Sequence, residues 1–271
     1  MLTKGVKMYD EMIDFMERTA REAGALLRGR VYARHDVQYK GEINLVTEAD
    51  HLSEELIVGR ISERFPLHGV MAEESPEMKN DSGFRWIIDP LDGTTNYAHG
   101  YPVFAVSIAL EVDGAIMLGA VYNPMSDECF MAAKGKGSFL NGQQLHVSRT
   151  DSLKRSLLAT GFPYDIRTDR NNNFNYFKAM ALNAQAIRRA GSAALDLAFV
   201  AAGRFDGFWE LKLAPWDTAA GWLILEEAGG VVTDLAGGSY NVHSPNILAT
   251  NGLIHGEMLR IISGTDPLDQ A

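Results

Sequence analysis

The chain has 271 residues, of which 46% are hydrophobic and 22% charged, as is typical of a folded globular protein. With 25 basic and 35 acidic residues, it has a net charge of −10. This acidity argues against nonspecific nucleic-acid binding, which depends on clustered Lys and Arg, so no nucleic-acid partner is expected. Cys129 is the only cysteine, which excludes an intrachain disulfide and a thiolate metal cluster.

The N-terminal segment has no apolar core of signal-peptide length. No apolar run approaches the roughly 18 residues that a membrane-spanning helix requires. We therefore expect no membrane partner and a cytoplasmic location.

The first elements are helical and then extended. Apolar residues recur at three- and four-residue intervals over 8–29 and predict an amphipathic helix. Partial alternation over 35–48 predicts two strands joined by a turn, after which a second helix begins at residues 47–50. Asp50 lies at the start of that helix, where a carboxylate stabilises free amides, so a structural cap is the favoured interpretation of this residue alone.

A turn and a short strand over 66–72 precede two glutamates, Glu73 and Glu74. Adjacent side chains on an extended segment point to opposite sides. Only one of the two glutamates can therefore enter a site directly.

The chain is organised around residues 84–110. Trp86 to Ile88 form a short apolar run that predicts a buried strand. This strand is expected to end at Asp89-Pro90, because proline cannot donate to a ladder and biases the preceding residue away from helix. Strand-like composition resumes at 103–110.

Asp89 and Asp92 stand three residues apart on the turn after this strand. Like charges this close raise one pKa unless a cation separates them. Mg²⁺ is suited to such a site, since it takes carboxylate and carbonyl oxygens and keeps positions for water and phosphate. Gly93 permits close approach of a ligand, and Thr94 and Thr95 supply donors for an anion. The alternative is an ordinary turn capped by threonines.

The rest of the chain alternates strands and helices. Asp113-Gly114 predicts a tight hairpin, and a change of texture near 148–156 separates an N-terminal subdomain, 1–147, from a C-terminal subdomain, 148–271. Strands are predicted at 104–112, 115–122, 129–133, 138–140, 157–160, 186–189, 205–211, 231–233 and 247–250, and helices at 175–184, 192–202, 218–227 and 255–263. The prediction is a mixed α/β fold.

Several residues of the second half have two interpretations. Gly191 precedes the helix 192–202 and either serves close packing or leaves amides free for an oxygen-rich ligand. Asp217 either caps the following helix or joins the acidic site. Arg188 and Arg189 come just before Gly191, and one is expected to reach a substrate while the other faces solvent.

Three motifs resemble those of the inositol monophosphatase family. Residues 86–96 read WIIDPLDGTTN and fit the signature W-x-I-D-P-[IL]-D-G-T-x-N. Residues 216–221 read WDTAAG and lead to EAGG at 227–230. Residues 72–75 read AEES, with Ala where the family usually has Gly. The matches follow the family's order over residues 8–260 and point to the bacterial and archaeal inositol-1-monophosphatase type among the Mg-dependent, lithium-sensitive phosphatases.

The resemblance implies a fold and a metal centre. The implied fold is a layered αβαβα sandwich, with a largely antiparallel N-terminal sheet and a mixed second sheet, usually as a homodimer. The implied cofactor is Mg²⁺, two or three ions in each site. The implied ligands are Glu73, Asp89, the carbonyl of Leu91, Asp92 and Asp217.

The resemblance also implies roles in catalysis and binding. Glu73 and Thr94 would position a metal-activated water, and Asp50 would fix Thr94. Lys40 falls in a family loop beside the site and faces either phosphate or solvent. The implied substrate-binding residues are Asp92, Gly93, Thr94, Arg188, Gly191, Ser192, Ala193, Glu210 and Asp217.

The expected activity is hydrolysis of inositol monophosphate, or a similar small polyol or sugar phosphate, by a Mg²⁺-dependent phosphomonoesterase. Relatives with the same core act on fructose 1,6-bisphosphate, histidinol phosphate or phosphoadenosine phosphate, and Asn96 favours the inositol type. The alternative from another class is a regulatory binding protein with a residual metal site.

Overall fold

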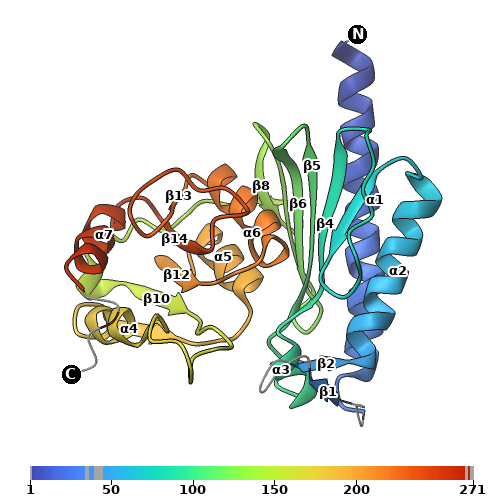
Figure 1. The fold of residues 1–271 in the computed structure, drawn as a ribbon. Coiled ribbons are helices and arrows are strands. Elements are labelled where there is room, and N and C mark those ends of the chain that lie inside the picture. Colours follow the sequence, from blue (N-terminus) through green and yellow to red (C-terminus); the bar gives the residue numbers. More distant parts are fainter. Residues whose placement is uncertain (1, 34–36, 40–44, 266–267, 269–271) are drawn as a thin grey trace.

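The computed structural model describes residues 2–33, 37–39, 45–265 and 268. The chain forms alternating layers of helix and sheet (Figure 1). Two long helices cover one face of a seven-stranded sheet, two further helices lie between this sheet and a five-stranded sheet, and a last helix pair covers the far side. This arrangement confirms the predicted αβαβα sandwich.

The first sheet is antiparallel apart from one edge. Its order is β3-β4-β5-β6-β7-β8-β9, and only β3 and β4 run parallel. The strands are β3 (Gly69–Ala72), β4 (Phe84–Asp92), β5 (Ala105–Val112), β6 (Ala115–Asn123), β7 (Glu128–Ala133), β8 (Gly137–Leu140) and β9 (Gln143–Gln144). The central strands β4 and β5 are buried along most of their length, which explains their nearly continuous apolar sequence.

Helices α1 (Leu2–Arg30) and α2 (Glu48–Arg64) pack on the outer face of this sheet. Met16, Leu27 and Ile57 from these helices are fully buried in the same core as Trp86 of β4. A small antiparallel pair, β1 (Val37–Tyr39) and β2 (Leu45–Thr47), precedes α2.

The second sheet is mixed, as predicted. Its order is β11-β10-β12-β14-β13, with parallel pairing from β11 to β12 and antiparallel pairing from β12 to β13. The strands are β10 (Leu157–Thr160), β11 (Ala186–Arg188), β12 (Gly207–Leu211), β13 (Val231–Thr233) and β14 (Asn246–Thr250). Helices α4 (Phe174–Ala181) and α7 (His255–Ser263) contribute Met180 and Met258 to the core on its outer side.

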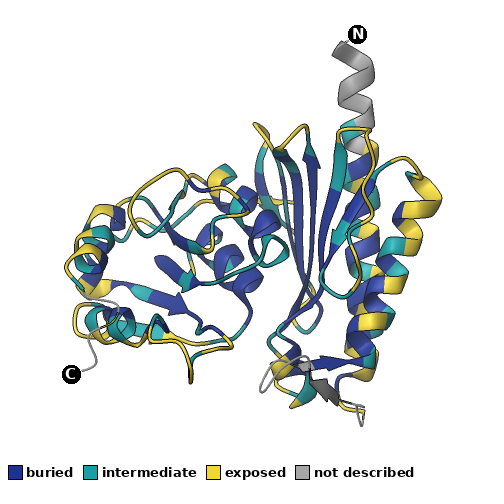
Figure 2. Cartoon of the chain, viewed as in Figure 1, coloured by how far each residue is buried: buried dark blue, intermediate teal, exposed yellow. Residues whose placement is uncertain are grey.

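Helices α5 (Ala193–Ala201) and α6 (Pro215–Glu227) fill the space between the sheets. Figure 2 shows them buried at the centre of the molecule. Small residues let these helices approach closely: a side chain on Gly119 of β6 would stand 2.9 Å from the backbone oxygen of Ala220 in α6. The two sheets therefore share one core through α5 and α6.

The structure differs from the sequence predictions at the central stretch. β4 continues through Pro90 to Asp92 instead of ending at Asp89, and its pairing with β5 shifts register between Asp89 and Asp92. Pro90 lies within this irregularity, where the missing N–H interrupts no regular ladder. The next residues form a short helix, α3 (Thr94–Ala98), rather than an open turn.

The buried face of α2 carries polar residues beside the apolar Ile57 and Ile61. Leu52 and Leu56 are only partly buried, whereas Asp50, Ser53 and Glu54 are buried. Apolar periodicity does not predict the burial of Asp50, Ser53 and Glu54, because their side chains are polar.

No described helix has the length and apolarity to cross a membrane. The division at residues 147 and 148 stays a prediction, and Lys40 lies outside the described residues.

The close contact of β6 with α6 makes Gly119→Ala a test of the shared core. A methyl group here meets helix backbone that cannot rotate away, so we expect a loss of about 1–3 kcal/mol in the free energy of unfolding. Urea denaturation followed by circular dichroism measures it.

Gly59→Ala is the matched control. Gly59 lies in α2 with no heavy atom within 4 Å of the added methyl group. Alanine has the higher helix propensity, so this variant is expected to gain up to about 1 kcal/mol. Equal effects of the two substitutions would contradict the packing that we describe.

Candidate active site

The end of β4 brings two aspartates to the edge of the sheet. Asp89 is 1% exposed, and one of its oxygens accepts a hydrogen bond from the Leu91 amide at 3.0 Å. Asp92 is 8% exposed and accepts hydrogen bonds from the Ser192 hydroxyl at 2.5 Å and the Ala194 amide at 2.8 Å. The start of α5 is thereby attached to the end of β4, across 100 residues of sequence.

Glu73 and Asp217 approach the same place from other elements. Glu73 follows β3, which pairs with β4, and its charge acts on Asp89. Asp217 lies in the first turn of α6, where its carboxylate accepts a hydrogen bond from the Ala214 amide at 2.7 Å. The cap that the sequence suggested for Asp217 is therefore present, and the same carboxylate also faces the acidic site.

The four carboxylates interact unfavourably. Burial raises the pKa of Asp89 well above its ordinary value, and the charges of Glu73, Asp92 and Asp217 raise it further. Burial likewise raises the pKa of Asp217, with Asp92 the strongest charged neighbour. Burial raises the pKa of Asp92 to about 6, although its bonds to the start of α5 oppose this shift. The site favours protons or a cation at these oxygens.

A polar face of α2 holds the segments that carry these groups. The Ser53 hydroxyl donates to the carbonyl oxygen of Pro90 at 2.8 Å. The carboxylate of Glu54 accepts from the backbone amide of Glu74 at 2.9 Å. Since Ser53 and Glu54 are both buried, α2 holds the end of β4 and the segment after β3 from one side.

Asp50, on the same face, connects the cap of α2 to the site. One of its oxygens accepts from the backbone N–H and the hydroxyl of Thr47, at 2.8 and 2.7 Å, and completes a capping box. The other oxygen accepts from the Thr94 hydroxyl at 2.9 Å. Both interpretations of Asp50 are therefore correct: it caps the helix and makes the hydrogen bond that the resemblance implies.

Gly93, which precedes Thr94, needs its special backbone conformation. Its φ of 100° lies in the left-handed region, and an added side chain would stand 3.0 Å from the carbonyl oxygen of Val103. Asn96, one turn later, donates to the carbonyl oxygens of Val103 at 2.7 Å and Ala190 at 2.8 Å. These bonds hold the backbone beside Gly191 against α3.

The opposite wall is formed by Glu210 and Arg189. Burial raises the pKa of Glu210 to about 8, Arg189 opposes this shift, and Asp92 adds to it. A side chain on Gly161 would overlap the Glu210 carboxylate, so Glu210 requires a glycine there. Asp196 in α5 is 1% exposed, and its pKa is raised well above the ordinary value by burial and by Glu210.

The structure separates the two neighbouring arginines. Both side chains are exposed, but Arg189 lines the cavity, whereas Arg188 is not a lining residue and donates to the carbonyl oxygen of its neighbour Ile187. The substrate contact that the resemblance implied for Arg188 is therefore not seen at this cavity. Two adjacent arginines after a short strand give no sequence signal for which one borders the cavity.

These residues surround a cavity of about 490 Å³. The predicted residues that line it are Asp92, Gly93, Thr94, Gly191, Ser192, Ala193, Glu210 and Asp217. The sequence interpretation missed Phe162, Tyr164 and Lys212, which also line it. Phe162 and Tyr164 belong to an aperiodic segment between β10 and α4, and only the nearby Gly161-Phe162-Pro163 turn marks it in sequence.

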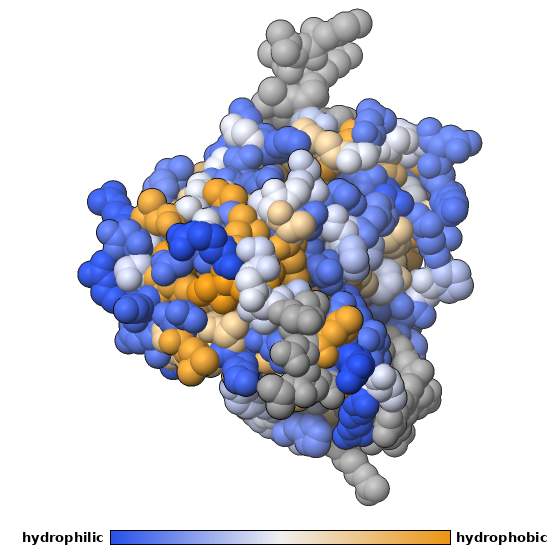
Figure 3. Space-filling model, turned by 60° about the vertical axis from the view of Figure 1, so that its left-hand side comes forward, coloured by the Kyte–Doolittle hydropathy of each residue, from blue (hydrophilic) through white to orange (hydrophobic). Residues whose placement is uncertain are grey.

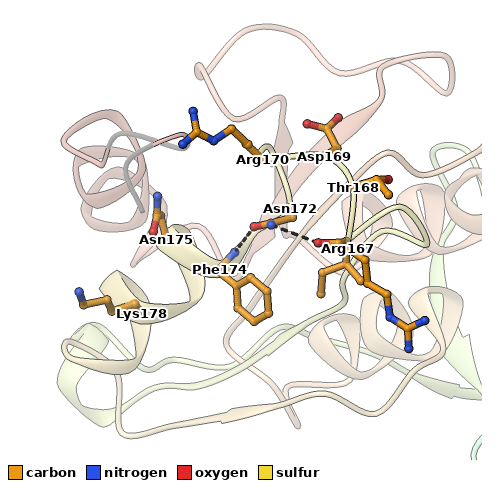
Figure 4. Close-up of a pocket in the computed structure, with 9 residues that line it drawn as sticks. Arg167, Thr168, Asp169, Arg170, Asn172, Phe174, Asn175 and Lys178 are labelled. Atoms are coloured by element: carbon orange, nitrogen blue, oxygen red, sulfur yellow. Dashed lines mark hydrogen bonds between the residues drawn. The ribbon is translucent and has the colours of Figure 1, made fainter. Parts of the chain in front are cut away.

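A larger cavity of about 670 Å³ lies elsewhere on the surface of this segment. Figure 4 shows its labelled side chains, among which Arg167, Arg170 and Lys178 point apart from one another. Its only acid is Asp169. Without convergent polar groups, this cavity is a weaker candidate than the smaller one.

The acids at and beside the smaller cavity fit a hard cation. Asp92 and Asp217 line the cavity, whereas Glu73, Asp89 and Leu91 are not lining residues, although the charges of Glu73 and Asp89 interact with the other two acids. Carboxylate and carbonyl oxygens are the ligand types that Mg²⁺ prefers. Within the described ranges, no three His, Cys, Asp or Glu side chains already stand in metal-ligand geometry. The acids raise one another's pKa, and a cation between them would relieve this repulsion.

The chain is similar to a known protein family and to individual known proteins. The sequence model of the Inositol monophosphatase family matches residues 8–264. An inositol-1-monophosphatase of Synechocystis sp. is 46% identical over 84% of this chain and 80% of its own length. The Nus factor SuhB of Escherichia coli is 41% identical over 92% of this chain and 94% of its own length.

Solved structures extend the comparison to three dimensions. The inositol monophosphatase from Anabaena (Nostoc) sp. superposes with a TM-score of 0.87 at 42% identity, and the match covers 96% of this chain and 98% of the other. The chain belongs to the inositol monophosphatase family.

Proposed function

We propose that this protein is a Mg²⁺-dependent phosphomonoesterase that hydrolyses inositol monophosphate or a similar small polyol or sugar phosphate. Membership of a phosphatase family supports the reaction class. The observation that carries the proposal is the convergence of four carboxylates from β3, β4 and α6 beside the Thr94–Asp50 hydrogen bond. Hydrolysis of phosphate monoesters needs such an assembly of charge, because the uncatalysed reaction is among the slowest known.

Two sets of metal ligands are proposed, and the carboxylate of Asp89 belongs to both. Glu73, Asp89 and the carbonyl of Leu91 would hold one ion, and Asp89, Asp92 and Asp217 a second, with Glu73 contributing to any third. When bound, Mg²⁺ activates water and neutralises charge on the phosphoryl group and the leaving oxygen.

Thr94 and Asp50 would orient the attacking water. The Thr94 hydroxyl donates to Asp50 at 2.9 Å, the shorter of its two contacts with acceptors, the other being the Leu91 carbonyl oxygen at 3.2 Å. The lone pairs of the Thr94 oxygen would then remain to accept a hydrogen bond from water. Asp50 is itself held by two bonds from Thr47. The direction of the Thr94 hydroxyl is thereby fixed before a substrate binds.

The walls of the cavity suit a polyhydroxylated organic group. Glu210, whose pKa is raised to about 8, would be protonated near neutral pH and could both donate to and accept from a sugar or cyclitol hydroxyl. Arg189 and the amides at the start of α5 add further donors. Asn96 after Thr94-Thr95 favours the inositol type over relatives of sulfur metabolism, and fructose 1,6-bisphosphate and histidinol phosphate remain the alternative substrates.

Three further properties stay predictions from the sequence: residence in the cytoplasm, formation of a homodimer, and binding of two or three ions.

Large apolar side chains such as Phe174 and Leu182 are exposed in the C-terminal half. Figure 3 shows apolar surface gathered on a face of this half, which favours a subunit contact. A regulatory, partner-binding role is the second candidate, favoured by the 41% identity to a Nus factor.

The proposal is tested by phosphate release from inositol 1-phosphate with and without Mg²⁺. We expect Mg²⁺-dependent release that Asp89→Asn lowers by about 10³-fold, since this substitution removes the bridging carboxylate. Asp81→Asn, which changes an exposed aspartate in the loop before β4, is the control and should keep full activity.

Substrate alternatives are separated in the same assay. Faster release from fructose 1,6-bisphosphate or histidinol phosphate would replace the inositol assignment. No Mg²⁺-dependent release from any of the three by folded protein would reject the enzyme and favour the binding role.

The Thr94–Asp50 bond is tested by a double-mutant cycle on kcat. Thr94→Val removes the hydroxyl and is expected to lower kcat by about 10²-fold with little change in KM. Asp50→Asn disturbs the same bond. If Asp50 acts through Thr94, the double variant loses no more than the larger single loss; additive losses would show that the two residues act independently.

A further inference from the structure

The segment 161–173, between β10 and α4, passes beside the mouth of the acidic cavity. Phe162, Pro163, Tyr164 and Asp165 from this segment line the cavity. Tyr164 is the one tyrosine among the lining residues, and 59% of its surface is exposed. Such exposure would ordinarily suggest a mobile surface side chain, but the segment that carries it is held at several points.

Asn173 fixes the far end of the segment to the second sheet. Its side-chain amide donates to the hydroxyl of Thr160 at 2.9 Å and the carbonyl of Gly161 at 2.6 Å. The indole N–H of Trp209, a fully buried residue of β12, donates to the Asn173 side-chain oxygen at 2.7 Å. The two ends of the segment are thus joined at the C-terminal end of β10.

Lys212 fixes the middle of the segment. Its ammonium group lies 2.7 Å from the carboxylate of Asp165 and 2.6 Å from that of Asp169. Lys212 follows β12, two residues after Glu210, and has a φ of 61°, a conformation that side chains seldom adopt. The backbone thus turns just past the substrate wall, and the ammonium group reaches Asp165, the neighbour of Tyr164.

Tyr164 shares the lining of the cavity with Asp92, Thr94 and Asp217, so its side chain borders the acidic end of the site. The phenol of tyrosine is a hydrogen-bond donor near neutral pH. The four carboxylates of the site would bind the phosphoryl group with Mg²⁺, whereas the wall that would meet the organic group is formed by Glu210 and Arg189.

We propose that the hydroxyl of Tyr164 donates a hydrogen bond to an oxygen of the phosphoryl group bound at the four carboxylates, and that Lys212 is a positioning residue that holds Tyr164 there. The proposal rests on the proposed function, since it requires a phosphoryl group in this cavity. It adds a protein donor at the mouth, on a segment that none of the three family motifs includes.

The test measures binding of inorganic phosphate to the full chain with saturating Mg²⁺, by calorimetry and by competitive inhibition of hydrolysis. Tyr164→Phe keeps the ring and removes only the hydroxyl. A hydrogen bond to a charged group has enough free energy that we expect about tenfold weaker phosphate binding. Tyr32→Phe is the matched control, because Tyr32 is 75% exposed and does not line the cavity.

Lys212 is tested in parallel. Lys212→Met should weaken phosphate binding about three- to tenfold and speed hydrogen exchange of the 161–173 backbone. Lys212→Arg keeps the charge and should restore both. In the Tyr164→Phe background, Lys212→Met should produce little further loss of phosphate affinity, because the bond that it positions is already absent.

The outcomes distinguish this proposal from the proposed function. Absence of hydrolysis by the unaltered chain would reject the proposed function, and with it the premise of the Tyr164 contact. Hydrolysis with equal phosphate affinity in the unaltered chain and Tyr164→Phe would overturn the Tyr164 contact alone. Weaker binding of the substrate without weaker binding of phosphate would also overturn it, by placing the hydroxyl against the organic group.

Discussion

The structure depends on one electrostatic constraint: acidic side chains gather where β3, β4 and α6 meet, and their charges repel. Burial and the neighbouring carboxylates both raise the pKa of Asp89 and of Asp217. Such a cluster costs folding free energy unless protons or a cation neutralise it. Packing of the surrounding fold offsets this cost, and the same repulsion would favour binding of a divalent cation over an uncharged ligand.

The rest of the fold holds these acids from several sides. Buried polar residues of α2 bind the Pro90 carbonyl, the Glu74 amide and the Thr94 hydroxyl. The start of α5 binds Asp92 through Ser192. Because α5 and α6 share one core with both sheets, rigid packing fixes the distance between the halves of the site. The 161–173 segment and Lys212 close the arrangement at the mouth.

Much of this was predictable from sequence, and the exceptions have physical reasons. Short apolar runs located β10 and β13 at their observed bounds, and helical periodicity located α7. The predicted end of β4 at Pro90 was wrong, since a register shift accommodates a residue that a regular ladder would reject. The buried polar residues of α2 and the position of Arg189, rather than Arg188, at the cavity left no periodic signal. Tyr164 was missed because its role depends on a tethered, aperiodic segment.

Thermal unfolding as a function of pH, with and without Mg²⁺, tests the central claim most directly. Unfolded aspartates titrate near pH 3.9, roughly, whereas the pKa of folded Asp92 is raised to about 6 and those of Asp89 and Asp217 are raised further above their ordinary value. The folded protein then binds more protons, so without Mg²⁺ its stability should fall as pH rises from about 4 to about 7. Saturating Mg²⁺ should raise the unfolding temperature increasingly over the same range. Identical curves with and without Mg²⁺ would contradict the account.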